Sequence, residues 1–309
     1  MMAHDLTIRP ARPDDRFAME RICAHTWEWG DYVPEVWDDW LAGEASSRAK
    51  GRSMEGPAIV GEIAGQVVAL SKITFQTSNQ VWLEGMRVDP EFRRRGVAGR
   101  FLDYSLAYAH EHGARVVRMG TGGQNTAVHT LMARAGMERV GTYVLRSAEL
   151  LLQGLRPRIL SAEQAGQVAA FLRDSAVLDN THGLYSFDWV WQELSAERVA
   201  HLLESSQMVA LQTADGTMTA LATIHFEPGA RTTWVGFADG QASAVAELAM
   251  AIRVHAAQIG AEGVSIMLPD LPWLRDAFGA AGYSPGDWEG ELWIFERRLD
   301  LGNEGEHDD

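Results

Sequence analysis

The sequence is poor in cysteine and contains no long apolar run. Cys23 is the only cysteine among 309 residues, which excludes an internal disulfide and any zinc site built from several cysteines, and we expect no metal site. No apolar run is long enough to span a bilayer. The opening MMAHDLTIRP has no basic segment followed by an apolar one, so no export signal is visible. We therefore expect a cytoplasmic protein with no membrane partner, in which Cys23 is a buried apolar residue on a helix rather than a nucleophile.

Positive charge is also scarce, and it is unevenly distributed. The net charge is −15, from 27 Lys+Arg and 42 Asp+Glu. Residues 1–150 hold 18 basic and 19 acidic residues, a net charge of −1, and residues 151–309 hold 9 and 23, a net charge of −14. A nucleic-acid surface needs a broad basic face, and the acidic second half would repel phosphate backbones. We therefore expect no nucleic-acid partner.

The two halves of the chain repeat one order of elements. Hairpins are predicted at 60–75 and 210–226, around Gly65 and Gly216. Each is followed by a strand, an amphipathic helix, a short strand, a second helix and a terminal strand. The glycines that punctuate these elements are offset by 151 (65 to 216), 147 (113 to 260) and 146 (136 to 282) residues. This spacing indicates duplication of a domain of ordinary size, although common punctuation of α/β chains could produce it by coincidence.

The predicted fold is therefore α/β (α+β mixed sheet). Two tandem domains, 1–150 and 156–300, each hold a mostly antiparallel twisted sheet flanked by helices. Each half is expected to end with its own closing strand, at 138–146 and at 291–299. The acidic tail, 301–309, is expected to be disordered.

Most of the clustered positive charge lies in MRVDPEFRRRGVAGR, residues 86–100, where a strand turns into a helix. A helix N-terminus has backbone N–H groups without intrahelical partners and a partial positive charge. Gly96 lets an anion approach that backbone, and arginines supply fork-shaped donors for phosphate oxygens. The stretch therefore predicts a phosphate site. The alternative is a solvated basic turn that Asp89 and Glu91 neutralise.

The same stretch resembles the GNAT superfamily of acetyl-CoA-dependent N-acetyltransferases. In that family an Arg/Gln-x-x-Gly-x-Gly/Ala motif between a strand and a helix binds the pyrophosphate of acetyl-CoA, and here it corresponds to residues 93–98. The order of elements agrees over most of residues 5–146. The second half has no such motif, so the resemblance implies two tandem GNAT-like domains, of which 1–150 binds acetyl-CoA and 156–300 is degenerate. The degenerate domain would support the first or complete its acceptor site.

The resemblance also implies a set of cofactor-binding residues. Backbone groups of the preceding strand would hold the pantetheine arm and polarise the acyl carbonyl, and Asn125 matches an asparagine that contacts the same arm. Asn125 is equally suited to cap a helix. The expected cofactor contacts are Met86, Arg87, Val88, Arg93, Arg94, Arg95, Gly96, Val97, Ala98, Gly99, Arg100 and Asn125.

Catalytic groups are less clearly marked. Glu84 is our candidate base, since the alternation of a strand would place it on the same face as Val88; an acid in the early loop and a plain surface carboxylate are the alternatives. Many family members carry a tyrosine that protonates the departing thiolate, but the matching residue here is Met132. Tyr143 is a candidate acid or a core aromatic, and a thiolate can leave without an acid.

The acceptor site is expected at HTWEWGDYVPEVWDDWL, residues 25–41, where aromatic residues alternate with carboxylates. That composition suits an organic cation. Trp37 and Trp40 are spaced to pack one helix. The loop residues Trp29, Asp31 and Tyr32 are the candidates for substrate contact, although the loop could simply pack on itself. The stretch at 84–99 also looks like acetyltransferases that act on free amino acids.

The sequence thus predicts an N-acetyltransferase that transfers an acetyl group from acetyl-CoA to the primary amine of a small molecule or amino acid, within a ternary complex. Two alternatives remain: a non-catalytic coenzyme A-binding or regulatory protein, and an acetyltransferase acting on protein lysines or N-termini. We expect a monomer or homodimer.

Overall fold

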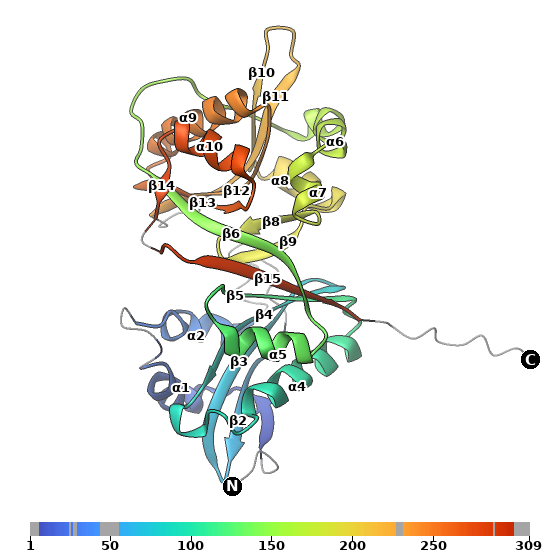
Figure 1. The fold of residues 1–309 in the computed structure, drawn as a ribbon, viewed down its shortest axis with the longest axis vertical. Coiled ribbons are helices and arrows are strands. Elements are labelled where there is room, and N and C mark those ends of the chain that lie inside the picture. Colours follow the sequence, from blue (N-terminus) through green and yellow to red (C-terminus); the bar gives the residue numbers. More distant parts are fainter. Residues whose placement is uncertain are drawn as a thin grey trace, which may run out of the picture. The chain divides into compact units, whose positions relative to one another are not determined.

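The computed structural model of the chain describes residues 6–24, 26, 30–43, 56–226, 231–286 and 288–299 (Figure 1). It divides into two compact units. The first comprises Met1–Gly120, Ala127–Glu138 and Phe295–Asp309, and the second comprises Thr121–Thr126 and Arg139–Ile294. No helix in these described ranges is both long and apolar enough to cross a membrane. The predicted tail, 301–309, lies outside the described residues.

The first unit follows the predicted order of strand, two helices, hairpin, strand, helix, strand and helix. Its strands are β1 (Thr7–Pro10), β2 (Ala58–Ile63), β3 (Gln66–Thr77), β4 (Gln80–Val88) and β5 (Val116–Gly122). Its helices are α1 (Arg16–Cys23), α2 (Val33–Ala42), α4 (Val97–Glu111) and α5 (Thr126–Arg134), with single 3-10 turns η2 (Pro13–Asp15) and η3 (Pro90–Phe92). Strands β1 to β4 pair antiparallel in sequence, whereas β4 and β5 pair parallel.

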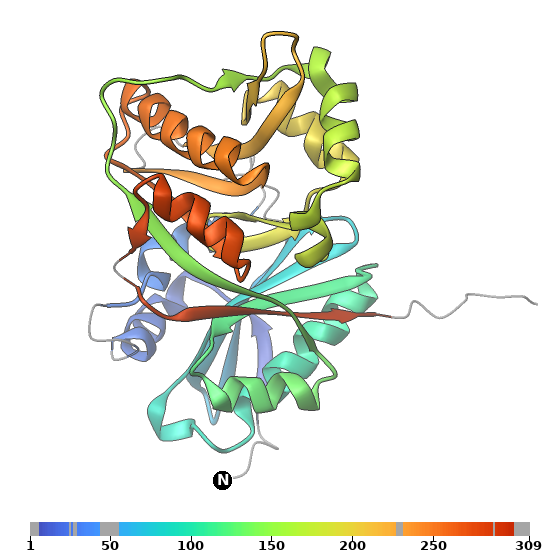
Figure 2. The same cartoon turned by 45° about the horizontal axis from the view of Figure 1, so that its top comes forward.

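Helices cover both faces of this sheet. Val60 of β2 packs with Trp37 and other buried residues of α1 and α2. The next residue, Gly61, faces the other way, since a Cβ there would lie 2.5 Å from the ring of Phe101 in α4. Helices α4 and α5 lie side by side (Figure 2), and a Cβ on Gly99 would be 3.7 Å from Leu131. Hence α1 and α2 cover one face, and α4 covers the opposite face.

The second unit contains the predicted repeat of these elements together with additional ones. Its strands are β6 (Glu138–Ala148), β7 (Arg158–Ile159), β8 (Leu184–Phe187), β9 (Val190–Glu193), β10 (Met208–Gln212), β11 (Met218–His225), β12 (Thr232–Gly240), β13 (Gly263–Pro269), β14 (Ser284–Pro285) and β15 (Glu291–Arg298). Its helices are η4 (Ala162–Gln164), α6 (Ala165–Arg173), α7 (Ala176–Asn180), α8 (Ala196–Glu204), α9 (Ala242–Gln258) and α10 (Pro272–Ala280). The β8–β9 hairpin lies outside the repeat that the sequence indicates.

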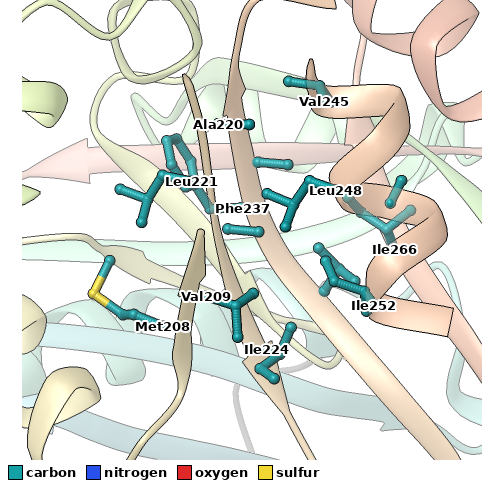
Figure 3. Packing of buried hydrophobic residues seen from close by; sticks show 14 of the residues in the cluster. Met208, Val209, Ala220, Leu221, Ile224, Phe237, Val245, Leu248, Ile252 and Ile266 are labelled. Carbon is teal, nitrogen blue, oxygen red and sulfur yellow. The ribbon is translucent and has the colours of Figure 1, made fainter. Parts of the chain in front are cut away.

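The core of the second unit forms between α9 and the strands beneath it. Val245, Leu248 and Ile252, spaced at three and four residues, are all at most 1% exposed. Figure 3 shows these side chains facing the strands that carry Ile224 and Ile266. Burying side chains of this size contributes about 1.5–3 kcal/mol each, so α9 is held chiefly by this apolar stripe.

The closing strands differ from the prediction. The sequence indicates that each half ends with its own strand, but β6 pairs antiparallel with β13 of the second unit, from Val264–Ala148 to Pro269–Tyr143. The end of β15, from Phe295 onward, belongs to the first unit. There Glu296 forms a buried ion pair with Arg118 of β5 at 2.7 Å. Nearly all of β6 thus belongs to the second unit, and in exchange the second half of β15 belongs to the first.

Candidate functional site

The predicted strand-to-helix stretch folds as expected. Strand β4 ends at Val88, a 3-10 turn begins at Pro90, and α4 begins at Val97. Gly96 is the N-cap of α4 with φ +82°, a conformation that favours glycine, and it has no side chain to cover the first turn. The first-turn N–H groups of α4 have no acceptor within the helix, as at any helix start. This end of α4 therefore presents backbone donors and a partial positive charge.

Three arginines precede this helix end, and all are exposed. The Arg93 Nε donates to the Val88 carbonyl at 3.0 Å, and the Arg95 guanidinium lies 5.0 Å from the centre of the Phe92 ring. In the part of the chain that the structure describes, no carboxylate forms an ion pair with Arg93, Arg94 or Arg95. Their charge thus adds to that of the helix end.

Asp89 does not neutralise these arginines, as the solvated-turn alternative requires. It is 3% exposed and forms an ion pair with Arg21 of α1. Its other carboxylate oxygen accepts from the Glu91 N–H at 3.0 Å. Asp89 therefore fixes the start of the turn to α1.

Strand β4 carries a bulge before this turn. Leu70 pairs with Arg87, but Lys72 pairs with Glu84, so β4 has one extra residue at Gly85 and Met86. Gly85 has φ +65°, and a Cβ there would lie 2.2 Å from the Trp40 ring of α2. Only glycine fits this position, since any side chain would meet both strain and a collision.

The bulge coincides with the end of the β4–β5 pairing. The parallel register runs from Gln80–Val116 to Leu83–Met119, whereas β4 continues to Val88 with β3 along its other edge. The pairs between β4 and β5 therefore end before Gly85. The edge of Gly85–Val88 on the side of β5 lies past the last of these pairs, next to the N-terminus of α4.

One prediction about Glu84 is wrong. Regular alternation would place Glu84 and Val88 on the same face, but the extra residue of the bulge reverses the face after Gly85. Because Leu70 and Lys72 share a face, their partners Arg87 and Glu84 share it as well. This is the face covered by α1 and α2, where Leu70 packs.

Asp31 and Tyr32 lie against the same part of β4. The Asp31 carboxylate accepts two hydrogen bonds from Arg87, from Nε at 2.7 Å and from Nη2 at 3.1 Å, and its side chain is 1% exposed. The Tyr32 ring lies 5.6 Å from the Arg87 guanidinium, and Tyr32 as a whole residue is 42% exposed. The predicted Trp29 lies outside the described residues. Trp37 and Trp40 pack α2 in the core, as predicted.

Burial and charge set the protonation of this cluster. Burial raises the pKa of Asp31, but hydrogen bonds from Arg87 and its charge outweigh burial, so the pKa is lowered overall. The pKa of Tyr32 is raised, first by desolvation and then by the charge of Glu84. Burial also raises the pKa of Cys23 to about 12, and the charge of Asp31 adds to this rise. Cys23 is thus a protonated core thiol, as the sequence indicates.

Two polar residues beside Glu84 were not predicted from the sequence. Thr74 donates from its hydroxyl to Glu84 Oε1 at 3.1 Å. Lys72 is 0% exposed, lies opposite Glu84 across the strands, and donates from Nζ to the Gly56 carbonyl at 2.5 Å. A lysine, the one charged residue of the predicted strand stretch ALSKITF, was the available signal, because lysine is almost never buried without a partner.

The remaining predicted residues belong to the second unit. Asn125 lies just before α5; its N–H donates to the Gly122 carbonyl at 2.9 Å, and its amide nitrogen donates to the Thr121 hydroxyl at 3.3 Å. Tyr143 is 2% exposed, packs 4.8 Å from Trp191, and lines a pocket of about 160 Å³. Their roles as cofactor contact and acid stay predictions. Met132, at the expected tyrosine position, is a buried residue of α5 in the first unit.

The second unit has a matching bulge without the polar groups. Thr223 pairs with Phe237 and Ile224 with Val235, so Gly236 is the extra residue of β12. Counted from the bulge, Val235 and Ala238 occupy the positions in β12 that Glu84 and Arg87 occupy in β4, and both are buried. A Cβ on Gly236 would lie 2.1 Å from the Ser186 carbonyl oxygen of the β8–β9 hairpin.

Comparisons with known proteins agree with this geometry. Residues 15–137 match the model of the acetyltransferase (GNAT) family. A GCN5-related N-acetyltransferase from Sphaerobacter thermophilus has a TM-score of 0.66 at 13% identity, covering 96% of this chain and 97% of its own. A putative acetyltransferase from Thermoplasma acidophilum has a TM-score of 0.58 at 15% identity, covering 95% and 100%.

A third solved structure bears on the repeat. A tandem GNAT protein from the clavulanic acid biosynthesis pathway has a TM-score of 0.54 at 13% identity, covering 95% of this chain and 98% of its own. No curated protein matches the chain. At these identities the structures show the fold, whereas the family match rests on residues 15–137. Residues 15–137, which include the bulged strand β4 and the glycine-capped helix α4, form a domain of the GNAT acetyltransferase family. The chain as a whole has the GNAT fold.

Proposed function

We propose that this chain is an N-acetyltransferase that uses acetyl-CoA to acetylate the primary amine of a small molecule or amino acid, by direct transfer within a ternary complex. One observation carries the proposal: the exposed arginines and the N-terminus of α4 at Gly96 adjoin an edge of β4 that lies beyond the β5 register. An anion and an extended chain therefore have adjacent places to bind.

The residues present fit the cofactor's diphosphate. The first-turn N–H groups of Val97, Ala98 and Gly99 point out of the helix end, and Gly96 leaves them uncovered. Arg94, Arg95 and Arg100 would supply charge to the phosphate oxygens. When bound, the cofactor would supply an acyl group activated as a thioester.

The bulged strand and Glu84 would perform the remaining chemistry. Backbone N–H groups between Met86 and Val88 would donate to the acyl carbonyl oxygen, where negative charge develops, a contact worth about 3–4 kcal/mol in acyl transfer. Glu84 would take the proton that the acceptor ammonium must lose before it attacks. A thiolate leaves readily, so a buried methionine at position 132 is compatible with turnover.

A small acceptor would contact Tyr32 and Glu84. The carboxylate of Asp31 is already held by Arg87 and is 1% exposed, so it serves to position β4 rather than to bind an amine. Tyr32, a residue that is 42% exposed, and the carboxylate of Glu84 would attract the cation. We propose that the acceptor is contacted by Tyr32 and Glu84, and not by the set of Trp29, Asp31 and Tyr32 that the sequence predicts.

The second unit would bind no cofactor of its own. Its helix α9 begins after Gln241 without an arginine loop, and the positions that correspond to Glu84 and Arg87 are Val235 and Ala238. These replacements support the proposal that the second GNAT-like domain, predicted at 156–300, is degenerate. One molecule of coenzyme A should therefore bind per chain.

Calorimetry with coenzyme A and a thiol-release assay test the proposal together. The double variant Arg95→Glu, Gly96→Asp should lose binding by at least about tenfold, whereas Arg173→Glu, an exposed arginine of α6, should bind like the wild type. Amines and amino acids should stimulate thiol release from acetyl-CoA. Binding without amine-dependent release would indicate a non-catalytic coenzyme A-binding protein, and stimulation by peptides alone would indicate a protein acetyltransferase.

A further inference from the structure

Lysine is nearly absent from this chain, yet one lysine lies at the candidate site. Of the 27 Lys+Arg residues, only Lys50 and Lys72 are lysines. Lys72 lies in the middle of β3 and is 0% exposed. Burying an ammonium is costly unless it is paired and hydrogen-bonded. The one hydrogen bond that it makes within the described residues, from Nζ to the neutral Gly56 carbonyl, does not compensate the charge.

The opposite charge comes from β4. Lys72 lies directly opposite Glu84 in the antiparallel register, and side chains that lie opposite on one face have Cβ atoms about 5 Å apart. The Glu84 carboxylate also accepts a hydrogen bond from Thr74, the next residue of β3 on that face. Lys72 and Thr74 of β3 therefore lie on the same face of the sheet as the candidate base.

We propose that Lys72 is a positioning residue for Glu84, whose ammonium holds the Glu84 carboxylate ionised so that it can take the proton of the acceptor amine. The proposal rests on the assignment of Glu84 as base and adds the group that makes it competent. Near a cation the ionised form of a carboxylate is favoured, and without the cation a partly buried carboxylate retains its proton to higher pH.

Three other titratable groups that the structure describes at this place are Arg87, Asp31 and Tyr32. Arg87 of β4 is bound to Asp31 through two hydrogen bonds. Tyr32, at the start of α2, keeps its hydroxyl proton because its pKa is raised. Burial lowers the pKa of Lys72 to about 8, and the charge of Glu84 opposes that shift. Coupling between two sites is reciprocal, so if Glu84 retains the proton on Lys72, then Lys72 favours loss of the proton from Glu84.

Nuclear magnetic resonance measures this coupling without reference to activity. Labelling lysine side chains gives two signals, and Lys50→Arg identifies that of Lys72. In Glu84→Gln the titration midpoint of Lys72 should fall by about one pH unit or more, because its negative partner is gone. Glu62→Gln, on β2 and paired with Arg9, is the control and should leave the midpoint unchanged. An unchanged midpoint in Glu84→Gln overturns the proposal.

The pH dependence of kcat/KM for the acceptor supplies the kinetic test. Lys72→Met, which keeps the length but not the charge, should move the acidic limb upward by about one pH unit, since Glu84 then holds its proton to higher pH. Thr74→Val, which removes only a neutral hydrogen bond, should move it much less. If Lys72→Met does not fold, the titration in Glu84→Gln decides alone.

The outcomes separate this proposal from the one on which it rests. Full activity in Glu84→Gln would remove Glu84 as base, and the role of Lys72 with it. Loss of activity in Glu84→Gln, combined with an unmoved acidic limb in Lys72→Met, would leave Glu84 as base and reject the role of Lys72.

Discussion

Asp31 and Arg87 form a buried two-point ion pair in the first unit, with distances of 2.7 and 3.1 Å between guanidinium nitrogens and carboxylate oxygens. Asp31 precedes α2, and its carboxylate also accepts from the Val33 N–H at 3.1 Å. Arg87 follows the bulge of β4. The pair therefore joins the start of α2 to the part of the strand on which the proposed chemistry depends.

Removing one partner of this pair should be costly. Asp31→Ala should lower the free energy of unfolding by about 3 kcal/mol, because it leaves the Arg87 guanidinium buried without a counter-charge. The matched control is Asp38→Ala, whose pair with Arg16 is at the surface with the carboxylate 82% exposed, and which should cost under about 1 kcal/mol. Urea unfolding followed by circular dichroism measures both values. Equal losses would contradict the special role of the buried pair.

The contribution of Asp31 should depend on pH in a defined direction. Its pKa is lowered in the folded state, so its stabilisation is fully present above the unfolded value of about 3.9 and is lost as pH falls through the folded pKa. The difference in urea midpoint between the wild type and Asp31→Asn should therefore be largest near pH 7 and shrink below about pH 4. A difference that stays constant from pH 7 to pH 3 would refute this assignment.

Gly85 and Gly65 offer a matched pair of substitutions. Both have positive φ, +65° and +79°, but a Cβ on Gly85 meets the Trp40 ring at 2.2 Å, whereas nothing lies within 4 Å at Gly65. Gly65→Ala should cost about 1 kcal/mol from backbone strain alone. Gly85→Ala should cost at least about 2 kcal/mol more and reduce acetyl transfer, since the bulge must shift. Thermal unfolding compares them, and similar losses would show that the close contact with Trp40 is unimportant.

Glu296 should stabilise the first unit although it follows the second unit along the chain. It pairs with Arg118 at 2.7 Å, and Arg118 also donates to Gln80 of β4 at 2.7 Å. Glu296→Ala should lower the free energy of unfolding of the first unit by about 3 kcal/mol and weaken coenzyme A binding, because Arg118 is 3% exposed. Glu262→Ala, which removes an exposed ion pair with Arg231 in the second unit, is the control and should change neither property. Coenzyme A binding at a denaturant concentration just below the wild-type midpoint reports on this unit, and full binding by Glu296→Ala there would oppose the prediction.

Much of the fold was predictable because its determinants are local. Strand β4 has the predicted bounds, 80–88, and α4 begins within one residue of the predicted helix stripe, since Gly96 and the apolar period both act within a few residues. The fold class and the family resemblance are confirmed for the same reason. The order of elements and the Arg93–Ala98 motif lie within one continuous range of the sequence, residues 15–137.

The rest depends on contacts between distant residues. Both β6 and β15 have the alternation of a closing strand, and nothing in the sequence says that β6 pairs with β13 rather than within the first half. The bulge at Gly85 adds one residue to β4, so each later side chain lies on the opposite face from the one that regular alternation predicts. As a result Val88 lies on the other face from Glu84, and Arg87 lies on the same face as Glu84. Lys72 could be connected with Glu84 only once the register of β3 and β4 was known.

The exchange of terminal strands also affects how the chain can fold during synthesis. Domains generally fold as units, N-terminal first, while the ribosome is still extending the chain. Here the first unit lacks Phe295–Leu299 until these residues have been made, whereas Arg139–Ile294 of the second unit is made earlier. The first unit therefore obtains all of its parts only after the second, and the proposed active site is supported by its complete unit only from then on.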